Sequence, residues 1–195
     1  MYVRTVEVLL VHNMKYRDML KGRGDYGYTD MMMGGRMPKD DERSDAVGEL
    51  DSLHASLGLI HHFLDSSDRE HMITIQKSLI NLMGEIPCKE ENKVKYLVKF
   101  GGLKHEDLDY LYSWVESLAD KLDEELGGQN TWSLYGQRGF NSALLFKAST
   151  DIRRCERRVV KLKHMGYLIR DEILSFINRL DKLVYMLAKK YEDEN

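Results

Sequence analysis

Apolar residues recur at alternating intervals of three and four positions in five stretches of the chain, and this pattern constrains the fold more than any other feature. The spacing places apolar side chains along one face of an α-helix. Only two prolines, Pro38 and Pro87, occur in 195 residues, so long helices are permitted. Helices with one such face pack nearly parallel, so we predict an all-α, five-helix bundle of the ferritin-like up-and-down type. The five predicted helices lie around residues 46–64, 72–86, 108–122, 145–162 and 169–187.

Short polar or glycine-rich segments separate the predicted helices. Ser67 or Asp68 is the predicted N-cap of the second helix, and the glycines at 127–128 end the third. Met165 and Gly166 are predicted to form the turn before the last helix. The stretch "KEENKVK" at 89–95 is predicted to be a solvated turn.

The N-terminal part of the chain lacks the helical period. We predict that residues 1–42 form an extension followed by a glycine-rich loop, and that residues 43–195 form the bundle. Residues 13–41 are interpreted as one long loop, and a structureless loop of that length is usually functional or disordered.

Composition and charge argue against several classes of function. The formal net charge is -3, whereas a general nucleic-acid binder carries a basic excess. Cys88 and Cys155 are far apart and belong to no CxxC pair, which is typical of reduced cysteines in the cytoplasm. The longest apolar run near the start is too short to span a bilayer and has no signal-peptide cleavage site. We therefore expect a cytoplasmic protein that binds neither nucleic acid nor membrane.

The histidines do not indicate a metal site. His54 and His61 share a helix face, but they are two turns apart, about 10.5 Å along the axis, which is too far for one ion. No HxxxH pattern or cysteine cluster supports zinc or iron. We therefore expect no protein-bound metal.

The loop "KGRGDYGYTD" combines glycines with charged groups. Glycine permits positive φ angles, which let backbone N–H groups converge on an anion. Two interpretations fit the loop: a phosphate-binding loop and a plain flexible loop, because glycine-rich loops are common. The glycines are Gly22, Gly24 and Gly27, and the polar groups that could assist them are Lys21, Arg23, Thr29 and Lys39.

The predicted fourth helix carries four arginines in six positions, within "DIRRCERRVVKL" at 151–162. At about 100° per residue, Arg153 lies in line with Arg157 and Arg154 in line with Arg158, all away from the apolar stripe. Guanidinium groups four residues apart can bind neighbouring phosphates through forked hydrogen bonds. A solvated helix face and an RNA-binding face fit the same residues, although no aromatic side chain is interleaved to stack on bases.

Several motifs follow one another in a fixed order along the chain. They are Gly-Asp-x-Gly-x-Thr at 24–29, "PKDDER" at 38–43, "AVGELDSLHASLG" at 46–58, "RRCERRVVKL" at 153–162 and "INRLDKLVYMLAK" at 177–189. In this order they resemble the PduO-type ATP:cob(I)alamin adenosyltransferases, most specifically at "RRCERRVVKL". The resemblance extends from Gly24 to Ala188, which is most of the chain.

The resemblance implies a five-helix bundle that assembles as a homotrimer with sites between subunits. It also implies an ATP:corrinoid adenosyltransferase, in which the cobalt of cob(I)alamin attacks the 5′ carbon of ATP bound with Mg²⁺, and triphosphate leaves. The nucleophile belongs to the corrinoid, so the protein needs no nucleophilic side chain. It does need cationic donors for the highly charged leaving group. A cobalamin-dependent mutase or dehydratase is the implied downstream partner.

Roles follow from the resemblance by matching positions. Arg153 and Glu156 match catalytic positions in the segment that contacts ATP. Asp51 matches an aspartate that forms an intersubunit salt bridge near the corrinoid. Trp132 lies near an aromatic residue that helps keep the lower ligand of the corrinoid off the cobalt. The expected nucleotide-binding residues are Lys21, Gly22, Arg23, Gly24, Asp25, Gly27, Thr29, Lys39, Arg154, Arg157 and Asn178.

The chain departs from the family pattern at several positions. Ser149 stands where the family has the arginine that pairs with the aspartate matched by Asp51, and the family's Asn-Arg-Leu-Ser-Asp reads Asn-Arg-Leu-Asp-Lys at 178–182. The residues that match the ATP-binding half of the family's site thus follow the family pattern more closely than those that match the corrinoid-binding half. A second hypothesis follows, a catalytically weakened paralogue that binds ATP and acts as a nucleotide or cobalamin sensor or chaperone. The other departures are at 21–23, Ser52, His54, Tyr135 and Gln137.

Overall fold

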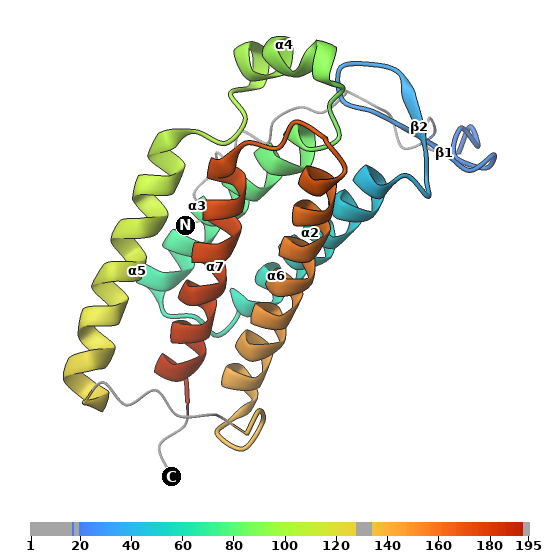
Figure 1. The fold of residues 1–195 in the computed structure, drawn as a ribbon. Helices are drawn as coiled ribbons and strands as arrows, with labels where there is room; N and C mark the ends of the chain where they lie inside the picture. The colour runs from blue at the N-terminus through green and yellow to red at the C-terminus, as the bar shows by residue number, and fades with distance from the viewer. Residues whose placement is uncertain (1–16, 18–19, 128–133, 193–195) are drawn as a thin grey trace.

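The computed structural model describes residues 17, 20–127 and 134–192. Five long helices lie side by side, and a shorter helix crosses one end of the group (Figure 1). Consecutive long helices run in opposite directions (Figure 1). The described part of the chain is therefore mostly helical, although it contains six helices and a short hairpin where the sequence predicted an all-α bundle of five helices. The long helices are α2 (Glu42–Ile60), α3 (Ser66–Glu85), α5 (His105–Leu126), α6 (Phe140–His164) and α7 (Asp171–Lys190).

The apolar faces expected from the sequence form the core. Every apolar residue that defines the five predicted helices is buried, from Ala46 in α2 to Leu187 in α7. Helix α6 packs between α2 and α7, α5 packs on α7, and α3 contacts α2 and α5. Full burial of each leucine or isoleucine contributes roughly 1.5–3 kcal/mol, so this core holds the bundle together. Within the described ranges, no helix is both long enough and apolar enough to cross a membrane.

Side chains fix the first turns of two helices. The carboxylate of Asp41 accepts a hydrogen bond from the Arg43 N–H at 2.9 Å and caps α2. The carboxylate of Asp65 accepts from the Asp68 N–H at 2.8 Å and caps α3. The predicted N-cap at Ser67 or Asp68 is therefore wrong, because four successive polar residues could each cap and only Asp65 reaches the free N–H groups.

The predicted solvated turn at 89–95 is also wrong, because helix α4 spans Glu90–Phe100. Only Lys93 and Tyr96 are buried in α4, so its sequence shows too few apolar residues for a periodic pattern. The Tyr96 ring packs against Gly84 and occupies space that a Cβ at this position would need. The Tyr96 hydroxyl donates to the Asn81 carbonyl at 3.0 Å. Helix α4 therefore belongs to the fold through contacts with α3.

Residues 13–41 are not one structureless loop, since they contain an antiparallel hairpin. Strands β1 (Tyr28–Asp30) and β2 (Arg36–Pro38) pair with Thr29 opposite Met37. Gly34 and Gly35 adopt φ angles of 88° and 86° in the turn, which suit glycine. Three-residue strands are too short to show an alternating pattern. The hairpin extends from the bundle beside the start of α2 (Figure 1).

Candidate functional site

The four arginines of α6 lie outside the core, as the helical spacing predicts. Ile152, Cys155 and Val159 occupy the opposite face and are fully buried. Burial raises the pKa of the Cys155 thiol to about 12, so this cysteine stays neutral and acts as a small apolar core residue. Arg154 and Arg157 are exposed, whereas Arg153 and Arg158 are half-buried.

Arg153 is held by two side chains at the contact between α6 and α7. Its Nε lies 3.2 and 3.1 Å from the two carboxylate oxygens of Asp181, and its Nη2 donates to Ser149 Oγ at 3.0 Å. Ser149 Oγ in turn donates to Asp181 Oδ1 at 2.6 Å. Burial lowers the pKa of Arg153, but hydrogen bonding and attraction to Asp181, with smaller contributions from Tyr135, raise it above its usual value. Arg153 therefore keeps its charge.

Acidic residues of α2 neutralise another part of the arginine face. Arg154 Nε donates to Glu49 at 2.6 Å, and its Nη2 to the buried carboxylate of Asp151 at 3.1 Å. Arg158 lies 3.3 Å from Asp45. Arg154, although predicted to bind nucleotide, is thus engaged in linking α6 to α2.

Arg157 differs from its three neighbours, because it forms no ion pair with any residue of the described chain. Next to it on α6, Glu156 accepts a hydrogen bond from Asn178 Nδ2 of α7 at 3.1 Å. The structure therefore brings together two residues that the sequence placed in the nucleotide site, Glu156 and Asn178. Beside them it leaves an exposed guanidinium free to bind an anion.

The glycine-rich loop is ordered by its own backbone. The Asp25 N–H donates to the Gly22 carbonyl at 3.0 Å, and the Gly27 N–H to the Gly24 carbonyl at 3.3 Å. Gly22 and Gly27 adopt φ angles of 64° and 77°, and the Asp25 carboxylate fills the space that a Cβ on Gly22 would need. The Lys39 N–H donates to the Gly27 carbonyl at 2.8 Å, and its ammonium lies over Gly24. These contacts bring the Lys39 ammonium to the glycine-rich loop.

Charged contacts brace the loop against the hairpin. Arg23 Nη2 donates to Asp30 at 2.9 Å, and Arg36 donates to the carbonyls of Arg23 and Tyr28. Thr29 is half-buried in β1, and Lys21 is exposed at the start of the loop. The loop leads through the hairpin into Glu42, which contacts Arg158 and Lys161 of α6. The loop and the arginine helix are therefore linked through the first turn of α2.

The residues expected near the corrinoid are not brought together within the described chain. Asp51 is exposed on α2 and forms no ion pair with a described residue. Lys147, the basic residue nearest in sequence to Ser149, is bound to Asp151 on its own helix at 2.6 Å. Trp132 lies outside the described residues.

Two residues of this region were not predicted as site residues. Asp181 holds Arg153, and the Tyr135 ring stacks on Phe146 with centroids 4.5 Å apart while the hydroxyl side approaches Arg153. The signal was present in the sequence, because both positions depart from the family pattern. The sequence alone does not indicate that both positions lie around Arg153, because they belong to separate segments of the chain.

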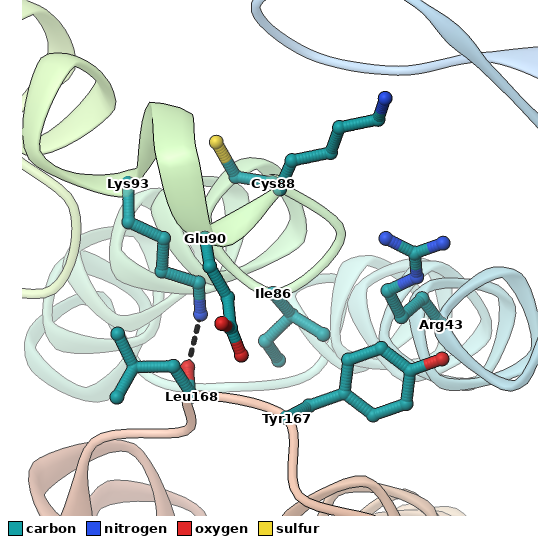
Figure 2. A pocket seen from close by; sticks show the side chains of 8 residues that line it. Arg43, Ile86, Cys88, Glu90, Lys93, Tyr167 and Leu168 are labelled. Atoms are coloured by element: carbon teal, nitrogen blue, oxygen red, sulfur yellow. Dashed lines mark hydrogen bonds between the residues drawn. The ribbon is translucent and has the colours of Figure 1, made fainter.

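A cavity of about 270 Å³ opens at the end of the bundle where α4 crosses it, and no predicted site residue lines it (Figure 2). Arg43 is bound by Asp41 through two hydrogen bonds of 2.9 and 2.7 Å, and its guanidinium lies 5.2 Å from the Tyr167 ring centre. Lys93 is buried and donates to the Leu168 carbonyl, and burial lowers its pKa. The lining residues are Arg43, Ile86, Cys88, Lys89, Glu90, Lys93, Tyr167 and Leu168.

Comparison with known proteins agrees with these features. A family model described as cobalamin adenosyltransferase matches residues 19–191. A corrinoid adenosyltransferase from Citrobacter freundii is 29% identical over 167 residues, which cover 85% of this chain and 90% of that protein. The human corrinoid adenosyltransferase MMAB is 28% identical over 171 residues, covering 85% of this chain and 65% of the human protein.

A solved structure supports the fold. It is a variant of the PduO-type ATP:corrinoid adenosyltransferase from Lactobacillus reuteri, complexed with cobalamin and ATP. Its TM-score is 0.73 at 24% identity, over 86% of this chain and 87% of that chain. A helical bundle with a glycine-rich loop and an arginine-lined helix face defines a class of mostly helical protein with donors suited to a polyphosphate. Within that class, the chain belongs to the cobalamin adenosyltransferase family, and the resemblance seen in its motifs is confirmed.

Proposed function

We propose that the protein is an ATP:corrinoid adenosyltransferase, which transfers the 5′-deoxyadenosyl group of ATP to the cobalt of cob(I)alamin and releases triphosphate. The family match and the names of the relatives support this activity. The structural observation that carries it is the outer face of α6, where Arg157 has no ion-pair partner in the described chain and Glu156 is held by Asn178. This face offers a free cation beside an oriented carboxylate.

The chemistry requires little from the protein beyond position and charge. The attacking atom is the cobalt of the substrate, so the side chains bind and orient ATP and stabilise the leaving triphosphate. Arg153 and Arg157 lie one turn apart on α6 and can each donate to phosphate oxygens. Lys39 and the backbone of the glycine-rich loop supply further donors.

Mg²⁺ fits this site as a partner of the nucleotide. The described part of the chain has no cluster of three or more side chains that could hold a metal ion. Mg²⁺ binds in proteins through one or two carboxylates together with substrate phosphates. Asp25 in the loop and Glu156 on α6 are the carboxylates of the proposed site that could complete its coordination.

The proposed assembly is a homotrimer with sites between subunits. Asp51 is exposed and has no ion-pair partner in the described part of its own chain, so it is available to a neighbouring subunit. The product, adenosylcobalamin, would be used by a cobalamin-dependent mutase or dehydratase in the cytoplasm. Light scattering in solution, with a mass of three chains expected, tests the assembly.

An anaerobic assay tests the activity. The purified protein is mixed with Mg-ATP and chemically reduced cob(I)alamin, and adenosylcobalamin formation is followed by absorbance. We expect turnover that falls steeply in Arg153→Ala. Absence of turnover by the wild-type protein, with ATP binding intact by calorimetry, would overturn the enzyme assignment.

The second candidate is a weakened paralogue that binds ATP as a sensor or chaperone. The departures on the corrinoid side favour it, since Ser149 replaces a family arginine and Lys147 is engaged with Asp151. ATP binding without turnover in the same assay would support this candidate.

A further inference from the structure

Arg153, Ser149 and Asp181 form a closed set of hydrogen bonds. Each of the three side chains contacts the other two, at 2.6 Å between serine and aspartate and at 3.0–3.2 Å from the arginine. Asp181 and Ser149 are 5% and 1% exposed, whereas the Arg153 side chain is 41% exposed. Two buried groups therefore hold one side of the Arg153 guanidinium, which Tyr135 also approaches and which remains partly exposed to solvent.

The contacts occupy one particular edge of the guanidinium. Nε and one N–H of Nη2 point to Asp181 and Ser149. A guanidinium has five N–H groups in a rigid plane, so fixing this edge also fixes the direction of Nη1 and of the second Nη2 proton. Those remaining donors form the edge that can bind two oxygens of one phosphate.

We propose that Asp181 and Ser149 are positioning residues that orient Arg153 toward the triphosphate of ATP before the substrate binds. The proposal rests on the proposed function, because it assigns Arg153 to the triphosphate. Fixing the side chain in advance lowers the entropy lost when ATP binds and keeps the donors aligned when triphosphate leaves.

The sequence supports a dedicated role for this pair. The family pattern has arginine at 149 and serine at 181, and this chain has serine and aspartate there. Ser149 and Asp181 contact each other, and both contact Arg153. The Asp181 carboxylate therefore accepts hydrogen bonds from Ser149 and Arg153. Lys182 Nζ, at 3.6 Å from Asp181, is 57% exposed and adds only a weak attraction.

The test measures kcat and the KM for ATP in Asp181→Asn and Ser149→Ala. Asparagine has the shape of aspartate but carries no charge and cannot accept through both terminal atoms. We expect kcat/KM to fall about 10- to 100-fold in Asp181→Asn, and less in Ser149→Ala, which keeps the Nε contact. Asp68→Asn is the matched control, because Asp68 is also 5% exposed and binds Lys190 and Tyr191. The control is expected to lower the melting temperature without lowering kcat.

A double-mutant cycle separates positioning from a general structural role. In an Arg153→Lys background, Asp181→Asn is expected to change kcat/KM by less than about threefold, because the group it positions is gone. An equal loss in both backgrounds, or no loss in the wild-type background, would overturn the proposal.

The same cycle is measured on the Kd of Mg-ATP by calorimetry, so the proposal is tested even if the wild-type protein shows no turnover. The positioning role is supported if Asp181→Asn weakens ATP binding in the wild-type background but not in the Arg153→Lys background. In that case, absence of turnover refutes only the adenosyl-transfer assignment. No ATP binding by the wild-type protein refutes both.

Discussion

Ser149 Oγ lies 2.6 Å from Asp181 Oδ1, across the contact between α6 and α7. Both positions depart from the family pattern, and their contact shows that the two substitutions act on one group, Arg153. The arginine lost at 149 is not replaced by Lys147, which binds Asp151 instead. The departures therefore alter the surroundings of Arg153 and remove the arginine that the family pattern pairs with Asp51 across a subunit contact.

The contrast between Arg157 and Arg158 gives the first prediction. Arg157 has no ion pair within the described ranges, whereas Arg158 is paired with Asp45 at 3.3 Å. Arg157→Ala is expected to raise the Kd of Mg-ATP about 10- to 100-fold, since a charge-assisted hydrogen bond is worth about 1.5–3 kcal/mol. The melting temperature should not change. Calorimetry of Arg158→Ala is the matched control, and equal losses of affinity in the two variants would contradict the assignment.

The second prediction concerns the glycine-rich loop. Gly22 has a φ angle of 64°, and a Cβ there would collide with the Asp25 carboxylate. Gly22→Ala is expected to distort the loop and weaken Mg-ATP binding, with little change in unfolding temperature because the loop lies outside the core. Gly34→Ala is the control, since Gly34 has a φ angle of 88° but open space around it. If both variants bind ATP equally well, the loop does not contact the nucleotide.

Helical periodicity predicted the long helices because their buried residues face one core in every turn. Leu50 in α2, Cys155 in α6 and Leu183 in α7, for example, lie on the apolar faces of their helices and are fully buried. The pattern missed α4 because only two of its residues, Lys93 and Tyr96, are buried. It missed the hairpin because three residues on each strand cannot display a period of two.

The sequence predicted some contacts of the candidate site and not others, because contacts between helices depend on how the helices pack. The motifs placed Glu156 and Asn178 in one site, and the structure brings them within 3.1 Å of each other. Arg153 and Asp181 are 28 positions apart, and their pairing depends on the register between α6 and α7, which the pattern of either helix alone does not indicate. The cavity beside Lys93 combines residues of four segments and is equally hidden in the sequence.

Acid should weaken the contact between α3 and the end of α7. The hydrogen bond from the Asp68 N–H, and then the Lys190 ammonium at 2.7 Å, lower the pKa of Asp65 to about 2 from its usual 3.8. The unfolded chain therefore takes up the proton more readily than the folded protein. The stabilisation is present above about pH 4 and is lost as pH falls toward 2.

Urea unfolding at pH 5 and pH 3 measures this effect. We expect Asp65→Asn to lose less stability than the wild type over this range, because asparagine still caps α3 but does not titrate. The difference should be about 1 kcal/mol or less, since the Asp65 side chain is 47% exposed. Asp109→Asn, which removes an exposed carboxylate 3.9 Å from His105, should retain the wild-type pH dependence. A steeper fall in Asp65→Asn than in the wild type would contradict the predicted sign.

A buried ion pair near α4 gives the last prediction. Glu85 is completely buried and accepts hydrogen bonds from Arg170 at 2.7 and 2.8 Å and from the Leu103 N–H at 3.1 Å. Arg170→Ala removes the cation that is hydrogen-bonded to Glu85 and leaves the carboxylate with only the attraction of Lys93, which should cost about 3–5 kcal/mol of unfolding free energy. Adding Glu85→Gln should recover part of that loss, because the buried group is then neutral. Lys163→Ala, which breaks a pair with the 84% exposed Asp171, should cost about 0–1 kcal/mol. Urea unfolding of the wild type and these three variants at pH 7 measures the differences, and equal costs for Arg170→Ala and Lys163→Ala would show that the buried pair does not join α3 to the start of α7.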